Sequence, residues 1–188
     1  LRERLSDYYE KGAKFCKWRA VITIGDNIPS DGCIESNMNA LARYASLCQE
    51  NNLVPIVEPE VLINGTHTID ECNLVTRRSL KSLFNHLKLL NVYLPGTVLK
   101  PSMVISGQEN TSRADIHKVA SMTIDCLKDC VPAETSGIAF LSGGQSDQEA
   151  ESHLNLMNKD SSLPWRVTFS YARAIQAAAL SAWKGEDD

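Results

Sequence analysis

The sequence predicts an α/β fold in which helices cover a parallel sheet. Short apolar runs alternate with longer amphipathic segments five times along the 188 residues. The apolar runs are nearly continuous, as expected for strands that a parallel sheet buries on both faces. Helical connections between such strands are typical of repeated βαβ units.

Five strands and six helices are expected in chain order. The first helix ends at Gly12, because glycine readily adopts the left-handed conformation that ends helices. Apolar residues at helical spacing define the other helices, and three of these start with Ser or Thr three residues before an acid. The strands are expected at 15–24, 53–57, 97–100, 137–141 and 167–170, and the helices at 1–11, 36–49, 68–89, 112–127, from 146 onward, and 172–183.

Charge and composition argue against several classes of function. The net charge is -4, which gives no reason to expect nucleic acid or an anionic membrane as a partner. No run of about 18 apolar residues is present, and no signal peptide is visible. The six cysteines form no C-x-x-C pair. We therefore expect no zinc site. The cysteines are expected to be reduced thiols in a cytoplasmic protein.

Polar side chains mark the end of each expected strand, about one βα unit apart. The carboxyl ends of parallel strands all lie on one face of the sheet. We therefore expect five groups to converge there: Lys17, Glu58, Lys100, Ser142 and Arg173.

Lys100 is the candidate nucleophile. It follows an apolar strand and has no charged neighbour within five residues, and Pro101 favours an extended conformation at Lys100. A lysine in a low-dielectric site loses its proton more easily and can attack a carbonyl carbon. The alternative is a strand-end lysine whose ammonium group reaches solvent.

Two carboxylates and two cations are candidate partners of this lysine. Glu58 and Glu60 are two residues apart, so they share a face of an extended backbone. One of them could act as a general acid or base while the other stays ionised. Lys17 and Arg19 share a face of the first strand, where Glu58 is the expected partner. The alternative for both pairs is a solvated strand exit.

A glycine-rich turn is the candidate phosphate site. Ser142, Gly143 and Gly144 lie between a strand and a helix start at Ser146, so backbone N–H groups and the helix dipole favour an anion there. Arg173 follows the next strand and can bind phosphate through two hydrogen bonds. The tryptophans, methionines and four histidines are interpreted as surface or packing residues.

Five βα units leave the sheet architecture open. A (β/α)₈ barrel has about 250 residues, so five units cannot close one. Either the strands form an open doubly wound sheet, or about three leading units are missing from this sequence.

Five ordered motifs resemble class I fructose-bisphosphate aldolase. The likeness runs nearly from end to end, with a shorter match at 42–46. The motifs are FCKWR (15–19), VPIVEPE (54–60), GTVLKP (96–101), FLSGGQS (140–146) and TFSYARA (168–174). The resemblance implies that residues 1–188 are a single domain: the C-terminal portion of a TIM (β/α)₈ barrel, strands four to eight, in a cytoplasmic homotetramer.

The resemblance also implies roles for these residues. Lys100 would form a Schiff base with the ketose, Glu58 would shuttle protons, and Glu60 and Lys17 would set the charge around the iminium. No metal or other cofactor would be needed. The implied substrate and phosphate ligands are Arg19, Ser142, Gly143, Gly144, Ser170, Ala172 and Arg173. Ala172 departs from the family, which commonly has glycine there.

The implied reaction is the glycolytic lyase reaction that cleaves fructose 1,6-bisphosphate to dihydroxyacetone phosphate and glyceraldehyde 3-phosphate. Two alternatives stay open. One is a silent scaffold that binds sugar phosphate, because the family's first three strands carry an aspartate that this sequence lacks. The other is a different Schiff-base aldolase whose substrate carries one phosphate.

Overall fold

The computed structural model describes residues 1–186, apart from the side chains of Arg173 and Ala174. Five parallel strands form one sheet, in which each strand pairs with the next one in the chain. The predicted fold class is confirmed. The strands are β1 (Phe15–Ile22), β2 (Val54–Val61), β3 (Val98–Leu99), β4 (Gly137–Phe140) and β5 (Val167–Phe169).

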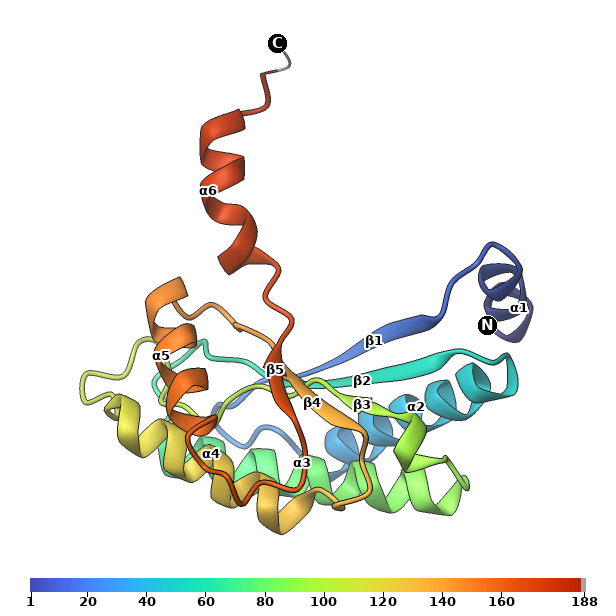
Figure 1. Cartoon of the computed structure of the whole chain (residues 1–188). Helices are drawn as coiled ribbons and strands as arrows, with labels where there is room; N and C mark the ends of the chain where they lie inside the picture. The colour runs from blue at the N-terminus through green and yellow to red at the C-terminus, as the bar shows by residue number, and fades with distance from the viewer. Residues whose placement is uncertain (187–188) are drawn as a thin grey trace.

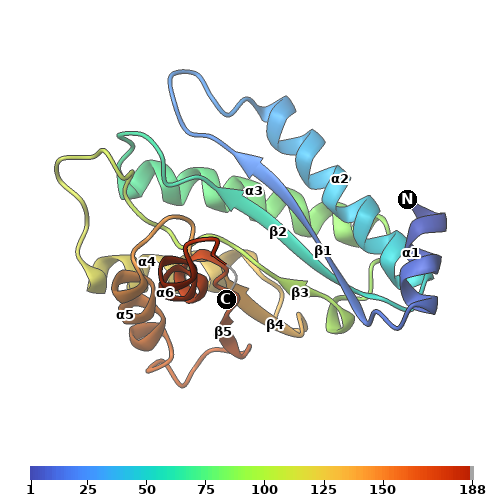
Figure 2. The same ribbon diagram turned by 90° about the horizontal axis from the view of Figure 1, so that it is seen from above.

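Helices connect the strands, and the longest of them lie together on one face of the sheet. Figures 1 and 2 show α2, α3 and α4 beneath β1, β2 and β3, with α6 projecting away from the sheet. Within the described residues, no helix covers the opposite face of β1. The helices are α1 (Arg2–Glu10), α2 (Asp31–Glu50), α3 (Ile69–Leu89), α4 (Ile116–Cys130), α5 (Asp147–Met157) and α6 (Arg173–Trp183), with a 3₁₀ turn at Leu94–Gly96.

This arrangement separates a dry layer from an open face. The dry layer lies between sheet and helices, where Ile22, Val57 and Leu99 are fully buried with Met38 and Leu83. Successive strand residues alternate faces, so the odd-numbered residues of β1 lie on the open face, and Phe15 is 61% exposed there. A sheet covered by helices on one face only, with strands in chain order, has the layout of a partial barrel wall.

Capping side chains fix where the helices begin. Thr68 and Ser146 each form the predicted capping box with the acid three residues later. The predicted starts of α2 and α4 were wrong. Ser30 accepts a hydrogen bond from the Cys33 N–H and starts α2 earlier than expected. Asp115, rather than Ser112, accepts the N–H groups that start α4.

The second strand continues further than predicted. Its predicted end at residue 57 was wrong, because β2 stays paired with β1 as far as Val61. Arg19 lies opposite Glu58 in this register, and Val21 lies opposite Glu60. Both carboxylates therefore belong to a rigid strand rather than to a loop. Conversely, β1 ends at Ile22, two residues before its predicted end.

Candidate active site

Lys100 is held between two neighbouring strands. Its backbone N–H donates to the Val57 carbonyl oxygen at 2.8 Å, and the next carbonyl, that of Pro101, accepts from the Leu141 N–H at 3.2 Å. The residue is 6% exposed. Its Nζ lies 3.1 Å from Glu58 Oε1. The lysine is therefore a buried amine paired with a buried carboxylate.

Glu58 is the centre of the charged cluster, and its side chain is fully buried. Lys17 Nζ lies 3.0 Å from Oε2, and Arg19 Nη2 lies 3.0 Å from Oε1. Arg19 Nη1 also lies 2.9 Å from Glu60 Oε2, so the guanidinium bridges the two acids. The side chains of Lys17 and Arg19 remain 40% and 42% exposed. Three cations thus surround one carboxylate that water does not reach.

The surrounding cations keep Glu58 ionised. Burial alone raises the pKa of this carboxyl group, but hydrogen bonds from Arg19, Lys17 and Lys100 act in the opposite direction, and the net pKa is lowered. The bond to Glu58 likewise raises the pKa of Arg19. An ionised carboxylate beside an amine can accept a proton from that amine when it reacts.

A small cavity of about 30 Å³ joins this cluster to the glycine-rich turn. Its lining residues lie in β1 and β2 or directly after β3, β4 and β5, and they include three charged side chains. The residues are Arg19, Glu60, Lys100, Leu141, Ser142, Gly143, Ser170 and Ala172. A cation, an amine and a hydroxyl at one small cavity suit a phosphorylated carbonyl compound.

The turn itself depends on its glycines. Gly143 and Gly144 have φ angles of +60° and +89°, a conformation that side chains disfavour. A Cβ atom on Gly143 would also lie 2.8 Å from Leu141 Cδ1. The Gln145 N–H donates to the Ser142 carbonyl oxygen at 3.1 Å and closes the turn.

The remaining predicted phosphate ligands lie around this turn. Ala172 has a φ of -83° and a ψ of -65°, so its methyl group causes no backbone strain. The Ser170 N–H donates to the Phe140 carbonyl oxygen at 2.8 Å. Gly144 is exposed and does not line the cavity. The side chain of Arg173 lies outside the described part of the structure.

Sequence reasoning missed a buried polar pair behind the turn. Gln145 is 8% exposed and His153 is 3% exposed, and His153 Nδ1 lies 2.8 Å from Gln145 Oε1. His153 shares the buried side of α5 with Ala150 and Met157. The helical spacing of His153 with these apolar residues is the one feature of the sequence that could have indicated its burial. It indicates ordinary packing as readily as a buried polar contact.

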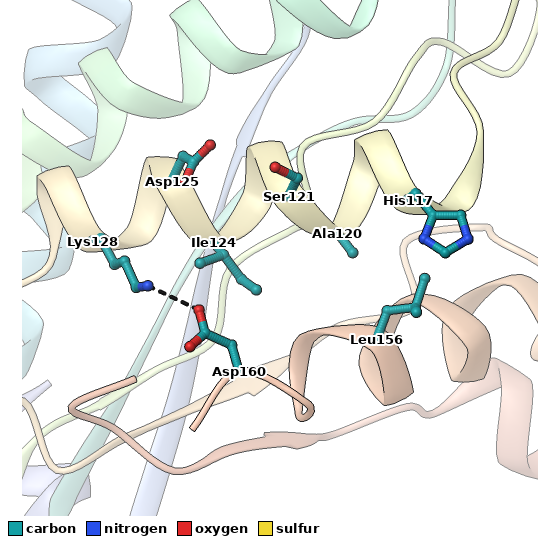
Figure 3. A pocket seen from close by; sticks show the side chains of 8 residues that line it. All are labelled: His117, Ala120, Ser121, Ile124, Asp125, Lys128, Leu156 and Asp160. Atoms are coloured by element: carbon teal, nitrogen blue, oxygen red, sulfur yellow. Dashed lines mark hydrogen bonds and ion pairs between the residues drawn. The ribbon is translucent and has the colours of Figure 1, made fainter. Parts of the chain in front are cut away.

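A separate groove between α4 and α5 contains none of the predicted site residues. Figure 3 shows Lys128 paired with Asp160 beside Ile124, and Leu156 lies further along the groove. His117 lies at one end and makes no pair with them in this view. Lys128 and Asp160 therefore neutralise each other in this groove. Among residues 1–186, none of the helices combines the length and apolarity that a membrane crossing needs.

The fold and the site together define a class of protein: a barrel-type α/β protein with a lysine–carboxylate cluster at the carboxyl ends of its parallel strands. The family model for class-I fructose-bisphosphate aldolase matches residues 1–188. The chain therefore belongs to the class-I fructose-bisphosphate aldolase family.

Named relatives agree with this assignment. A probable fructose-bisphosphate aldolase class 1 from Xanthomonas axonopodis pv. citri is 56% identical over 97% of this chain and 55% of its own length. The cytosolic fructose-bisphosphate aldolase 4 of Arabidopsis thaliana is 47% identical over 100% of this chain and 48% of its own length. The chain thus spans about half the length of the curated relatives it matches.

A solved structure is also similar. It is fructose-bisphosphate aldolase from Plasmodium falciparum, in a complex with TRAP and a small-molecule inhibitor. The match has a TM-score of 0.95 and 45% identity, and covers 99% of this chain and 54% of that one.

Proposed function

We propose that residues 1–188 form the C-terminal portion of a (β/α)₈ barrel that cleaves fructose 1,6-bisphosphate to dihydroxyacetone phosphate and glyceraldehyde 3-phosphate. The observation that carries the proposal is the buried pair of Lys100 and Glu58, 3.1 Å apart. The family assignment supports it, and no metal takes part in the proposed steps.

In the first step the Glu58 carboxylate takes a proton from the Lys100 ammonium group, and the free amine adds to the ketone carbon of the sugar. A second proton then moves from the nitrogen to the former ketone oxygen and gives the carbinolamine, and Glu58 donates the proton that it holds to the carbinolamine hydroxyl group. That hydroxyl leaves as water, and an iminium forms on Lys100. Lys17, 3.0 Å from Glu58, balances the negative charge while the carboxylate is ionised.

In the second step a base removes the proton of the C4 hydroxyl. The electrons of the C3–C4 bond move into the iminium, so glyceraldehyde 3-phosphate leaves and an enamine remains. Protonation at C3 and addition of water then release dihydroxyacetone phosphate and restore the Lys100 amine. The resemblance implies an aspartate on the family's first strand, which these 188 residues do not include, and we propose that this aspartate is the base.

The phosphate nearest the ketone is proposed to bind at Ser142, Gly143, Ala172 and Arg173, with Ser170 and Gly144 close by. Arg19 and its exposed guanidinium face the second phosphate. Glu60 holds Arg19 in place through their ion pair at 2.9 Å. We also propose the family's homotetramer and a cytoplasmic location for the whole protein.

The test is cleavage of fructose 1,6-bisphosphate by the 188-residue chain, beside a chain extended to eight strands. Lys100→Met should abolish cleavage by whichever form is active. Lys118 is an exposed lysine of α4, so Lys118→Met is the matched control and should cleave fructose 1,6-bisphosphate as the unsubstituted chain does. Full cleavage by Lys100→Met would overturn the proposal.

A second candidate is a binding module without turnover. The 40% exposure of Lys17 and the 42% exposure of Arg19 favour it, because water at these cations weakens control over the charge on a reacting sugar. This candidate predicts phosphate affinity in both chain lengths and cleavage in neither.

A further inference from the structure

Two buried side chains behind the glycine-rich turn hold one of its carbonyl groups. The Ser142 carbonyl oxygen accepts two hydrogen bonds from Gln145: one from the backbone N–H at 3.1 Å and one from Nε2 at 3.0 Å. Because the amide NH₂ group of Gln145 is used as a donor, its Oε1 is left to accept.

His153 completes this chain of hydrogen bonds. Its Nδ1 lies 2.8 Å from Gln145 Oε1. Since Oε1 is an acceptor, Nδ1 must carry the proton, which fixes the tautomer of the ring. The order of donation is therefore His153 to Gln145 to Ser142.

Burial makes this arrangement specific. Gln145 is 8% exposed and His153 is 3% exposed, so water does not readily replace a lost partner. A buried amide without its partner reorients or carries a desolvation penalty. Reorientation removes one of the two hydrogen bonds that hold the Ser142 carbonyl group. The peptide planes of Gly143 and Gly144, which have positive φ angles, are then held less firmly.

We propose that His153 and Gln145 are positioning residues, which hold the turn so that the Ser142 hydroxyl and the Gly143 N–H face a bound phosphate. This inference rests on the proposed function, which places a phosphate at the turn. Neither residue lines the cavity; His153 acts through Gln145, and Gln145 acts through Ser142.

Two variants of the full 188-residue chain test the inference. His153→Leu removes the donor and keeps an apolar side chain. His153→Asn is the conservative variant, because its amide nitrogen takes the place of Nδ1. Calorimetric titration with inorganic phosphate should show binding about fivefold weaker in His153→Leu, the value of one hydrogen bond. In His153→Asn the affinity should stay within about twofold of the unsubstituted chain.

A second readout separates positioning from a general structural role. Borohydride trapping of dihydroxyacetone, which has no phosphate, reports on Lys100 alone and should be equal in all three chains. Equal phosphate affinity in His153→Leu overturns the inference, as does a parallel loss of phosphate affinity and trapping. Should His153→Leu fail to fold, Gln145→Met is tested in the same way.

The two proposals can fail separately. Absence of trapping in the unsubstituted chain, with phosphate affinity and its dependence on His153 intact, overturns the proposed function but supports the positioning role. Absence of phosphate binding in the unsubstituted chain overturns the positioning role.

Discussion

Arg19 lies opposite Glu58 in the β1–β2 register, and its guanidinium binds both Glu58 and Glu60, at 3.0 Å and 2.9 Å. One cation therefore fixes two carboxylates that leave the same strand on the same face. With both carboxylates held, the amine of Lys100 meets a partner of defined position. The geometry of the reacting pair is thus set by a neighbouring strand.

Glu58→Gln should destabilise the fold. The amide cannot balance the charge of Lys100, which stays buried, and removing one partner of a buried ion pair costs about 3 kcal/mol. Urea denaturation followed by circular dichroism measures the loss. Glu50→Gln, which breaks the surface pair with Arg2, is the control and should leave the midpoint unchanged. Equal midpoints for Glu58→Gln and the unsubstituted chain would contradict the view that Glu58 balances the cluster.

Acid should weaken the fold partly through His67. This ring is 6% exposed, and burial lowers its pKa although the Ile105 backbone and Glu71 oppose the shift. The unfolded chain then binds the proton more readily, so stability is complete above the ordinary value of 6.5 and falls as the pH drops below it.

His67→Phe keeps a ring of similar size without a titrating group. As the pH is lowered from 7 to 5.5, the free energy of unfolding should fall less steeply in this variant than in the unsubstituted chain. The two slopes should differ by about 0.5 kcal/mol per pH unit. Denaturation series at several pH values measure the slopes. A variant that loses stability as steeply as the unsubstituted chain would show that His67 is not responsible.

Gly107→Ala should separate the loops that follow β2 and β3. The Gly107 N–H donates to the His67 carbonyl oxygen at 2.8 Å, and an added Cβ atom would lie 2.2 Å from the Gly65 carbonyl oxygen. Such overpacking costs about 1–3 kcal/mol. Gly137→Ala, whose Cβ would make an ordinary contact of 3.6 Å, should differ from the unsubstituted chain by less than about 0.5 kcal/mol. Comparable losses in the two variants would refute the close approach.

Asp115→Ala should shorten α4 at its start. The Asp115 carboxylate accepts the N–H groups of His117 and Lys118, both at 2.9 Å, so its loss leaves two helix donors unpaired. The melting temperature is expected to fall by about 3 °C, whereas Ser112→Ala should not change it. A larger fall in melting temperature for Ser112→Ala than for Asp115→Ala would instead support a helix that begins at Ser112, as the sequence suggested.

Much of the fold was predictable because five short, largely apolar runs alternate with amphipathic helical segments, and polar side chains follow β3, β4 and β5 within two residues. The same pattern placed Lys17 and Arg19 on one face, and their pairing with Glu58 follows from the two-residue period of strands. Chain order and parallel direction then bring Lys100 to the same cluster.

Other features depended on information that local sequence does not carry. Pro59 suggests that β2 has ended, yet pairing with β1 continues to Val61. Ser112 and Asp115 are both acceptable helix caps, and only the path of the preceding loop chooses between them. The contact of His153 with Gln145 links a helix face to a turn, so its spacing resembles ordinary packing.

The most direct test of the central claim is to trap the amine of Lys100. The chain is incubated with dihydroxyacetone phosphate and borohydride, digested, and examined by mass spectrometry. A single reduced adduct on Lys100, absent from Lys100→Met, is the predicted result. Labelling of other lysines with Lys100 left unmodified would contradict the account.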